Sequence, residues 1–259
     1  MSTRGRRYDA TVLRGERLSP HLVRIVLGGL GRTGFASTGV PDEWVGLVVP
    51  GQFQSRYYTV RRWTGTELIL DVALHQHGLV TDWASRDCRG ERVTVTEPRG
   101  SFAMPREAAW LLLVGDLTAL PAMARIVETV RSVPIRVVAE VPDDLTGYLP
   151  AATDVEVTWM VPPPNGPSAL ARMVEELDWP PGDGYFWMAG ESAQMRSIRK
   201  HLLRVRRMPS GAYDVMGYWR VAATRQPRSV DPGPIYRAGR AAGHSDDEIW
   251  ASYDAARES

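Results

Sequence analysis

The hydrophobic pattern of this chain changes once, near Met104, and that change most constrains what it can fold into. Before Met104, six short β-branched or alternating runs are separated by turn residues, at 8–14, 21–27, 44–49, 55–62, 67–74 and 92–97. One helix-like insert lies at 79–86. Short strands with turn signals between them are typical of a small antiparallel barrel. We therefore expect residues 1–104 to form an antiparallel Greek-key β-barrel.

Beyond Met104, strand-like and helix-like segments alternate. The run 110–115 is continuously apolar, as in a strand that is buried on both faces. Further strands are expected at 135–140, 155–160, 184–189 and 213–217, and helices at 119–131, 168–177 and 192–206. This alternation predicts a mostly parallel sheet wrapped by helices. The expected fold class is thus α+β with two domains, the second being an α/β domain at 105–221.

The last segment, 222–259, is expected to be a linker followed by a short helix. Residues 222–234 are rich in Arg and Pro, and residues 245–248 match a helix capping box. A helix near 245–256 would present Ile249, Trp250 and Tyr253 on one apolar face. We expect that face to dock on the α/β domain or on another copy of the chain.

Composition excludes several classes of function. The formal net charge of +1 gives no general attraction to nucleic acid. Cys88 is the only cysteine, so a site built from several thiolates is excluded and a reducing, cytoplasmic location is expected. The N-terminal residues lack the apolar core of a signal peptide, and apolar runs such as 110–114 are too short to span a membrane.

The basic residues are almost all arginine. Of the 31 basic residues, only Lys200 is a lysine. This bias fits a GC-rich coding genome, and it also fits recognition of flat, delocalised anions such as phosphates and metal chelates. The two explanations are compatible.

The segment Arg56-Tyr57-Tyr58-Thr59-Val60-Arg61 is the most informative stretch. On a strand, alternate residues share a face, so Arg56 and Tyr58 point one way and Tyr57 and Thr59 the other. A flavin dinucleotide needs a cation for its pyrophosphate, an aromatic ring beside the isoalloxazine and a small hydroxyl near N5. This segment offers all three, although alone it is equally compatible with a half-buried strand whose arginines face solvent.

A second segment, residues 75–83, follows a strand and opens a helix. Free backbone N–H groups at the helix start, next to Gly78 and the Thr81 hydroxyl, would form an anion site suited to two phosphates. Taken alone, either His75 or His77 fits an ordinary surface or core histidine better than a ligand contact. No Cys, Asp or Glu stands at ligand spacing beside them, so no metal site is expected.

Together these segments resemble the siderophore-interacting proteins, a family within the ferredoxin–NADP reductase superfamily. Residues 56–61 resemble the family's Arg-x-Tyr-Thr-[Val/Leu]-Arg flavin motif. Further similarities follow in the right order at 71–83, 97–102, 115–122, 187–191 and 217–220. The likeness covers roughly residues 8–220. No G-x-G-x-x-G fingerprint is present, so that motif does not carry the interpretation.

The resemblance implies an FAD-binding barrel, a nicotinamide-binding-like α/β domain and a role for each motif residue. Arg56 would pair with the pyrophosphate, and Tyr58 beside the flavin and Thr59 near N5 would be the catalytic residues. Other implied contacts to the flavin are Tyr57, His75, His77, Gly78, Val80, Thr81 and Trp83. The nicotinamide approach would be formed by Asp116, Thr118, Ala119, Gly190 and Glu191.

The implied activity is that of a ferric-siderophore reductase. NADPH, NADH or a ferredoxin-like protein donor would reduce FAD, which would pass electrons to the Fe(III) of a siderophore and release Fe(II). The chelate brings the metal, so the protein needs no metal ligands of its own. An anionic chelate favours a basic pocket, for which Arg220 is the first candidate and Arg61 and Arg62 are the next, although these two also suit a solvated strand end.

Three departures from the family pattern leave alternatives open. Gly46 stands where the family usually has a lysine, Leu117 replaces a glutamate, and residues 161–164 replace a basic segment that would bind the phosphate of NADPH. The first alternative is a flavin reductase-like protein that serves a partner redox enzyme. The second is a non-catalytic binding protein with a flavin fold.

Overall fold

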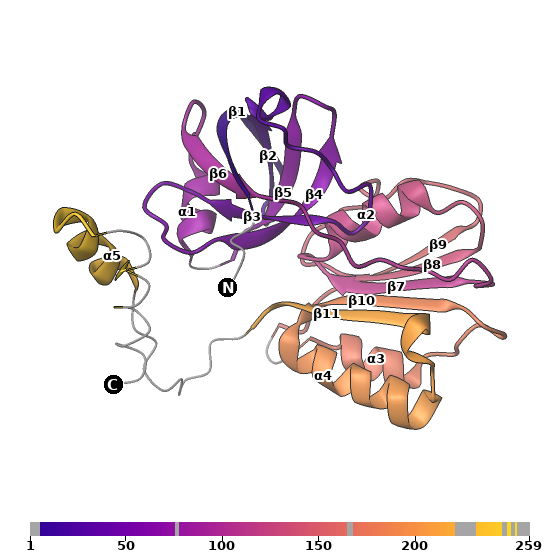
Figure 1. Ribbon diagram of the computed structural model, residues 1–259. Coiled ribbons are helices and arrows are strands. Elements are labelled where there is room, and N and C mark those ends of the chain that lie inside the picture. Colours follow the sequence, from indigo (N-terminus) through magenta and orange to yellow (C-terminus); the bar gives the residue numbers. More distant parts are fainter. Residues whose placement is uncertain are drawn as a thin grey trace.

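The computed structural model describes residues 6–75, 78–164, 168–220, 232–244, 248, 249 and 252. Figure 1 shows a barrel packed against one side of a sheet, with two helices on the opposite side of that sheet. Among the described residues, no helix has both the length and the apolar character needed to cross a membrane.

Six antiparallel strands close the barrel in the order β1-β2-β5-β4-β3-β6. Because β2 lies beside β5 and the consecutive strands β4 and β3 follow, four of the strands form a Greek key. The bounds are β1 (Arg7–Ser19), β2 (Leu22–Gly28), β3 (Trp44–Val48), β4 (Arg56–Trp63), β5 (Leu68–Ala73) and β6 (Arg92–Thr96). A 3₁₀ turn (Leu30–Arg32) follows β2, and helix α1 (Leu79–Ser85) follows β5. The predicted barrel is confirmed.

The second sheet has five parallel strands in the order β11-β10-β7-β8-β9. Their bounds are β7 (Leu111–Asp116), β8 (Ile135–Glu140), β9 (Val155–Met160), β10 (Tyr185–Glu191) and β11 (Tyr213–Trp219). The strand order reverses between β7 and β10, and open α/β sheets bind ligands at the carboxyl ends of the strands beside such a switch point. The predicted fold class is therefore confirmed, whereas the exact domain boundaries stay a prediction.

Helices cover both faces of this sheet. Helix α2 (Leu120–Thr129) lies on the face toward the barrel, and α3 (Leu170–Glu176) and α4 (Ser192–His201) lie on the other face (Figure 1). Every residue of β7 is buried, as its continuous apolar run predicted. The expected helix at 192–206 has the predicted extent, but its last turn is a π-helix (Leu202–Arg206), followed by a 3₁₀ turn (Ser210–Ala212).

Polar contacts join the barrel to the α/β half. Arg125 of α2 donates to the Glu43 carboxylate at 3.1 Å and to the Val60 carbonyl at 2.6 Å. Both oxygens of Glu128, also on α2, accept from Arg61 at 2.7 and 2.9 Å. These bonds fix strand β4, which carries the predicted flavin motif, against the second sheet.

The C-terminal segment differs from expectation. Helix α5 (Pro232–Ala241) begins inside the predicted linker, and its Tyr236 ring lies 4.9 Å from Phe53 in the β3–β4 loop. Ile249 is buried, and a Cβ on Gly239 would lie 2.4 Å from Ile249 Cγ1. Ile249 thus packs on α5, which touches the barrel, where docking on the α/β domain was expected, and docking of this segment on another copy of the chain stays a prediction. Ser245, Trp250 and Tyr253 lie outside the described residues.

Candidate functional site

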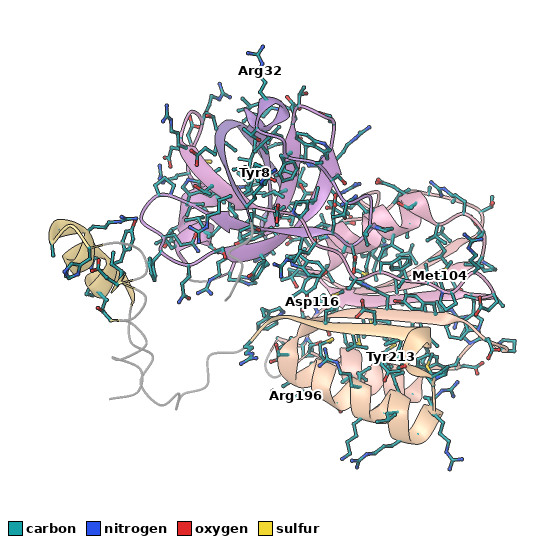
Figure 2. All side chains as sticks on the ribbon, viewed as in Figure 1. Tyr8, Arg32, Met104, Asp116, Arg196 and Tyr213 are labelled. Carbon is teal, nitrogen blue, oxygen red and sulfur yellow. The ribbon has the colours of Figure 1, made fainter. Side chains whose placement is uncertain are left out.

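The candidate site lies where the carboxyl ends of β7, β10 and β11 face the barrel. Asp116 ends β7, Glu191 ends β10 and Trp219 ends β11. Figure 2 shows Asp116 in the layer between the barrel and the sheet. The topology therefore brings together three strand ends that are far apart in the sequence, at the edge where ligands of α/β sheets collect.

Asp116 is the polar centre of this edge. One carboxylate oxygen accepts from the backbone N–H of Thr118 at 2.9 Å and from its hydroxyl at 2.6 Å. The other accepts from the indole N–H of Trp219 at 2.7 Å. Burial raises the pKa of Asp116, and these bonds from Thr118 and Trp219 oppose that rise. The site thus holds a buried carboxyl whose charge is stabilised by three donors.

Two glycines allow this packing. Gly190 has φ +158°, and a Cβ there would lie 2.8 Å from a carboxylate oxygen of Asp116. A Cβ on Gly217 would lie 2.5 Å from the Ser192 hydroxyl, which donates to the Trp219 carbonyl at 2.8 Å. Gly190 was predicted as a cofactor contact, and in the structure it makes room for Asp116.

Trp219 connects the sheet edge to the barrel. Its ring lies 6.1 Å from that of His75, which follows β5. Sequence reasoning assigned Trp219 no contact to the site. Its position at the end of the last strand was visible in the sequence, but its pairing with Asp116 depends on strand order, which the sequence pattern does not give.

Along the predicted flavin strand, burial increases from Arg56 to Thr59 and does not alternate from residue to residue. Tyr57 is 69% exposed and Arg56 is also exposed, whereas Tyr58 is half-buried and Thr59 is buried. Burial raises the pKa of Tyr58 to about 12, and the charge of Arg56 works in the opposite direction. Arg56 and Tyr58 therefore lie close together, as expected for residues on one face of a strand.

Two buried hydroxyls meet between β4 and β11. Thr59 Oγ1 and the Tyr218 hydroxyl are neighbours, and neither makes a hydrogen bond of normal geometry to any residue that the structure describes. Burial raises the pKa of Tyr218 far above its usual range, and the charge of buried Asp42 raises it further. Buried hydroxyls normally have a partner, so these two are placed to serve each other, and each is left without a second partner among the described residues.

The helix-start segment is partly described. The His75 backbone N–H donates to Thr81 Oγ1 at 3.3 Å, and Gly78 precedes the first turn of α1. Val80 and Trp83 are buried in the barrel core, and the Trp83 indole donates to Glu91 at 2.9 Å. Their side chains are thus used within the barrel. His77 lies outside the described residues.

Two other residues predicted to contact the cofactor, Ala119 and Glu191, cap helices of the α/β half. Ala119 is fully buried and caps α2 at its N-terminus. The Glu191 carboxylate caps α4 by accepting from the backbone N–H groups of Ala193 at 2.7 Å and Gln194 at 3.0 Å. Both residues shape the edge, and both capping bonds of Glu191 use the same carboxylate oxygen.

The three predicted substrate arginines differ in exposure and in ion pairing. The Arg61 guanidinium is only 13% exposed and is paired with Glu128. Arg62 and Arg220 are exposed, and no ion pair holds either within the part of the chain that the structure describes. Arg220 directly follows β11 beside Trp219, so it is the one that lies at the candidate site.

Gly46, where the related family usually has lysine, occupies a crowded position. A Cβ there would lie 3.0 Å from both Ser55 Cβ and Thr96 Cγ2, and the Gly46 N–H donates to Thr96 Oγ1 at 2.8 Å. A longer side chain at this position would require its neighbours to shift, so the departure suits the local packing.

Comparison with known proteins agrees with this arrangement. Residues 51–102 match the siderophore-interacting FAD-binding domain, and residues 108–222 match the siderophore-interacting protein domain. An uncharacterized protein of Mycobacterium tuberculosis is 30% identical over 257 residues, covering 83% of this chain and 90% of that one. The chain belongs to the siderophore-interacting protein family.

Two further relatives are informative about this siderophore-interacting protein. The NADPH-dependent ferric-chelate reductase of Escherichia coli is 28% identical over 218 residues, covering 74% of this chain and 85% of the relative. A siderophore utilization protein from T. fusca has a similar structure, with a TM-score of 0.74, 29% identity and coverage of 85% of this chain and 95% of that one. The FAD-binding match includes β4 and α1, and the second match includes Asp116 and Trp219.

Proposed function

We propose that this siderophore-interacting protein is an FAD-dependent ferric-siderophore reductase that takes its electrons from NADPH. The observation that carries the proposal is the buried pair of hydroxyls, Thr59 and Tyr218, which lie next to each other between the flavin strand and the carboxyl edge of the sheet and have no further partner among the described residues. The names of two relatives support it: the ferric-chelate reductase of Escherichia coli and a ferric vibriobactin reductase of Vibrio cholerae.

The residues of this chain fit FAD. Arg56 is an exposed cation suited to the pyrophosphate, and Tyr58 offers a half-buried ring beside it. Thr59 offers a hydroxyl whose polar neighbour is Tyr218 and which has no further partner among the described residues, so it is the group of this strand proposed to contact a ring nitrogen. Gly78 and the first turn of α1 provide backbone N–H groups for the second phosphate.

Bound FAD would supply a carrier that accepts two electrons and releases them one at a time. The chain's own residues would bind and orient it. Arg56 would hold the pyrophosphate, Tyr58 would exclude water from one side of the ring system, and Thr59 would fix a ring nitrogen by a hydrogen bond. Trp219, held by Asp116, would border the opening through which a donor or an acceptor approaches.

The substrate side depends on charge. The ferric chelate brings its own metal, and among the described residues no group of three or more His, Cys, Asp or Glu could hold a metal ion. We propose Arg220 as the main cation for an anionic chelate and Arg62 as a secondary one, because both are exposed. Arg61 is left out, because Glu128 already neutralises it.

Fewer residues of the chain bear on the electron donor than on the flavin. Residues 161–164, which follow β9, contain no basic residue that could bind the extra phosphate of NADPH. NADH and a ferredoxin-like protein therefore remain alternative donors. The cytoplasmic location expected from the single cysteine also remains a prediction.

Anaerobic stopped-flow absorbance tests the proposed function. The FAD-loaded protein should lose its flavin band when mixed with NADPH and regain it when a ferric siderophore is added, with Fe(II) trapped by a chromogenic chelator. A protein that takes up no FAD would support the binding-protein alternative. If NADPH reduces the flavin and no ferric chelate reoxidises it, the result would favour the alternative in which the protein passes electrons to a partner redox enzyme.

A further inference from the structure

The end of α4 and the π-helix after it carry an unusual concentration of positive charge. Residues 196–207 contain six cationic side chains, and residues 192–213 contain no Asp or Glu. The whole chain has a net charge of only +1, so this segment is locally far more basic than the protein. We call Arg196, Lys200, Leu203, Arg204, Val205 and Arg207 the α4 basic face.

The cations of this face are not neutralised by the fold. Arg196, Lys200, Arg204 and Arg207 are exposed, and none of them forms an ion pair or a side-chain hydrogen bond within the described ranges. The two other cations of the segment do have partners: Arg199 donates to the Val215 carbonyl, and Arg206 lies over the Trp179 ring at 4.7 Å. Four free cations therefore point to an anionic partner.

Two large aliphatic side chains are exposed among these cations. Leu203 is 61% exposed and Val205 is 67% exposed, while Leu202 beside them is fully buried. The π-helix (Leu202–Arg206) widens the last turn, and such turns occur frequently at functional sites. The result is a short surface on which two aliphatic groups alternate with arginines.

We propose that the α4 basic face binds the surface of an anionic lipid bilayer. Arginine and lysine are attracted to anionic headgroups, and aliphatic side chains between them can enter the boundary between headgroups and acyl chains. A protein partner suits this surface less well, because the cores of protein interfaces are enriched in aromatic side chains, whereas the α4 basic face contains none.

The position of the face is compatible with the candidate site. Helix α4 starts beside the carboxyl end of β10 and runs back along the face of the sheet that is opposite the barrel (Figure 1). Arg204 and Arg207 therefore lie at the end of the sheet away from Asp116 and Trp219. A protein held by this face would keep the edge with Asp116 and Trp219 away from the bilayer.

Vesicle sedimentation of the full-length protein tests the proposal without any activity measurement. Wild-type protein should bind vesicles that contain phosphatidylglycerol and should bind pure phosphatidylcholine vesicles much less. The pair Arg204→Glu and Arg207→Glu should reduce binding by about tenfold or more, given the attraction expected per basic residue. The pair Leu203→Ser and Val205→Ser should reduce it several-fold.

The control pair, Arg32→Glu and Arg89→Glu, makes the same change in net charge at exposed positions of the barrel half. It should leave vesicle binding unchanged, and circular dichroism should show that every variant is folded. Equal loss in the control pair, or no binding by wild-type protein, would overturn the proposal. Loss on charge reversal with full binding by the serine pair would overturn the placement of Leu203 and Val205 in the bilayer boundary and would leave an attraction by charge alone.

Discussion

Glu43→Gln is the change that best tests how the two halves of the protein are held together. The Glu43 carboxylate is completely buried and accepts from the Ser37 hydroxyl at 2.5 Å and from the Thr38 N–H and hydroxyl at 2.7 and 2.6 Å. It also pairs with Arg125 of α2 at 3.1 Å. Glutamine has the same shape, but it has no charge and only one acceptor oxygen.

The expected loss of stability follows from burial. Removing one partner of a buried ion pair costs about 3–5 kcal/mol, because the remaining charge is left uncompensated. Arg125 keeps 14% exposure and its bond to the Val60 carbonyl, so we expect a loss near the lower end, about 3 kcal/mol. Glu67→Gln is the matched control, because its partner Arg14 is 50% exposed, and it should leave stability unchanged.

Urea denaturation followed by tryptophan fluorescence measures both variants. FAD affinity should fall with Glu43→Gln as well, because Arg125 anchors the carbonyl of Val60, the residue after Thr59. If Glu43→Gln is as stable as Glu67→Gln, the pair with Arg125 does not fasten the barrel to α2.

Four further predictions concern the cofactor, the substrate, the C-terminal helix and the pH dependence of stability. Arg56→Ala should weaken FAD binding in a fluorescence titration by about ten- to a hundredfold, the range for a lost charge-assisted bond; full flavin occupancy would contradict the placement of the pyrophosphate. Arg220→Ala should raise KM for an anionic ferric chelate while sparing FAD content, and should affect a neutral chelate much less; equal effects on both would remove it from the substrate site. Truncation after Arg228, which removes α5, should keep flavin bound, and loss of the yellow colour would show that α5 supports the cofactor. Burial raises the pKa of Asp116 in the folded state. Its contribution to the free energy of unfolding is therefore present when the pH is below the unfolded pKa of about 3.9, and it is lost as the pH rises through the folded pKa. Wild-type stability relative to Asp116→Asn should therefore fall in urea denaturation as the pH rises above the unfolded value of about 3.9, and a constant difference would refute the shift.

Local pattern was sufficient to predict most of the elements. The continuous apolar run of β7 and the aromatic and β-branched run of β4 each identify a strand without any knowledge of its neighbours. Strand β1 was predicted to end at Arg14 but runs to Ser19, because irregular pairing between Val12 and Arg14 and again between Arg17 and Ser19 breaks the two-residue period. Hydrophobic alternation is a poor guide wherever a bulge interrupts it.

The candidate site was less predictable, because its members meet through topology. Asp116 and Trp219 are 103 residues apart, and they meet only because β10 lies between β7 and β11. Arg61 looked like a substrate residue because the sequence gives its strand face but not what packs there, and its partner Glu128 lies 67 residues later. Helical spacing similarly could not show that Val80 and Trp83 enter the barrel core.

The junction of the two halves could not be predicted from the sequence, because it too depends on how distant segments meet. Its polar contacts join residues far apart in sequence, such as Asp71 with Tyr148 and the Ser19–His21 turn with Asp143. Burial opposes ionisation of Asp143, but bonds from Ser19 and His21 outweigh it and lower its pKa. The contribution of Asp143 to the free energy of unfolding is therefore fully present when the pH is above the usual pKa of a carboxyl group. It is lost as the pH falls through the lowered pKa of Asp143. Since the barrel carries the flavin strand and the sheet carries the proposed approach of the donor, the geometry of electron transfer depends on these few polar contacts as well as on the two cores.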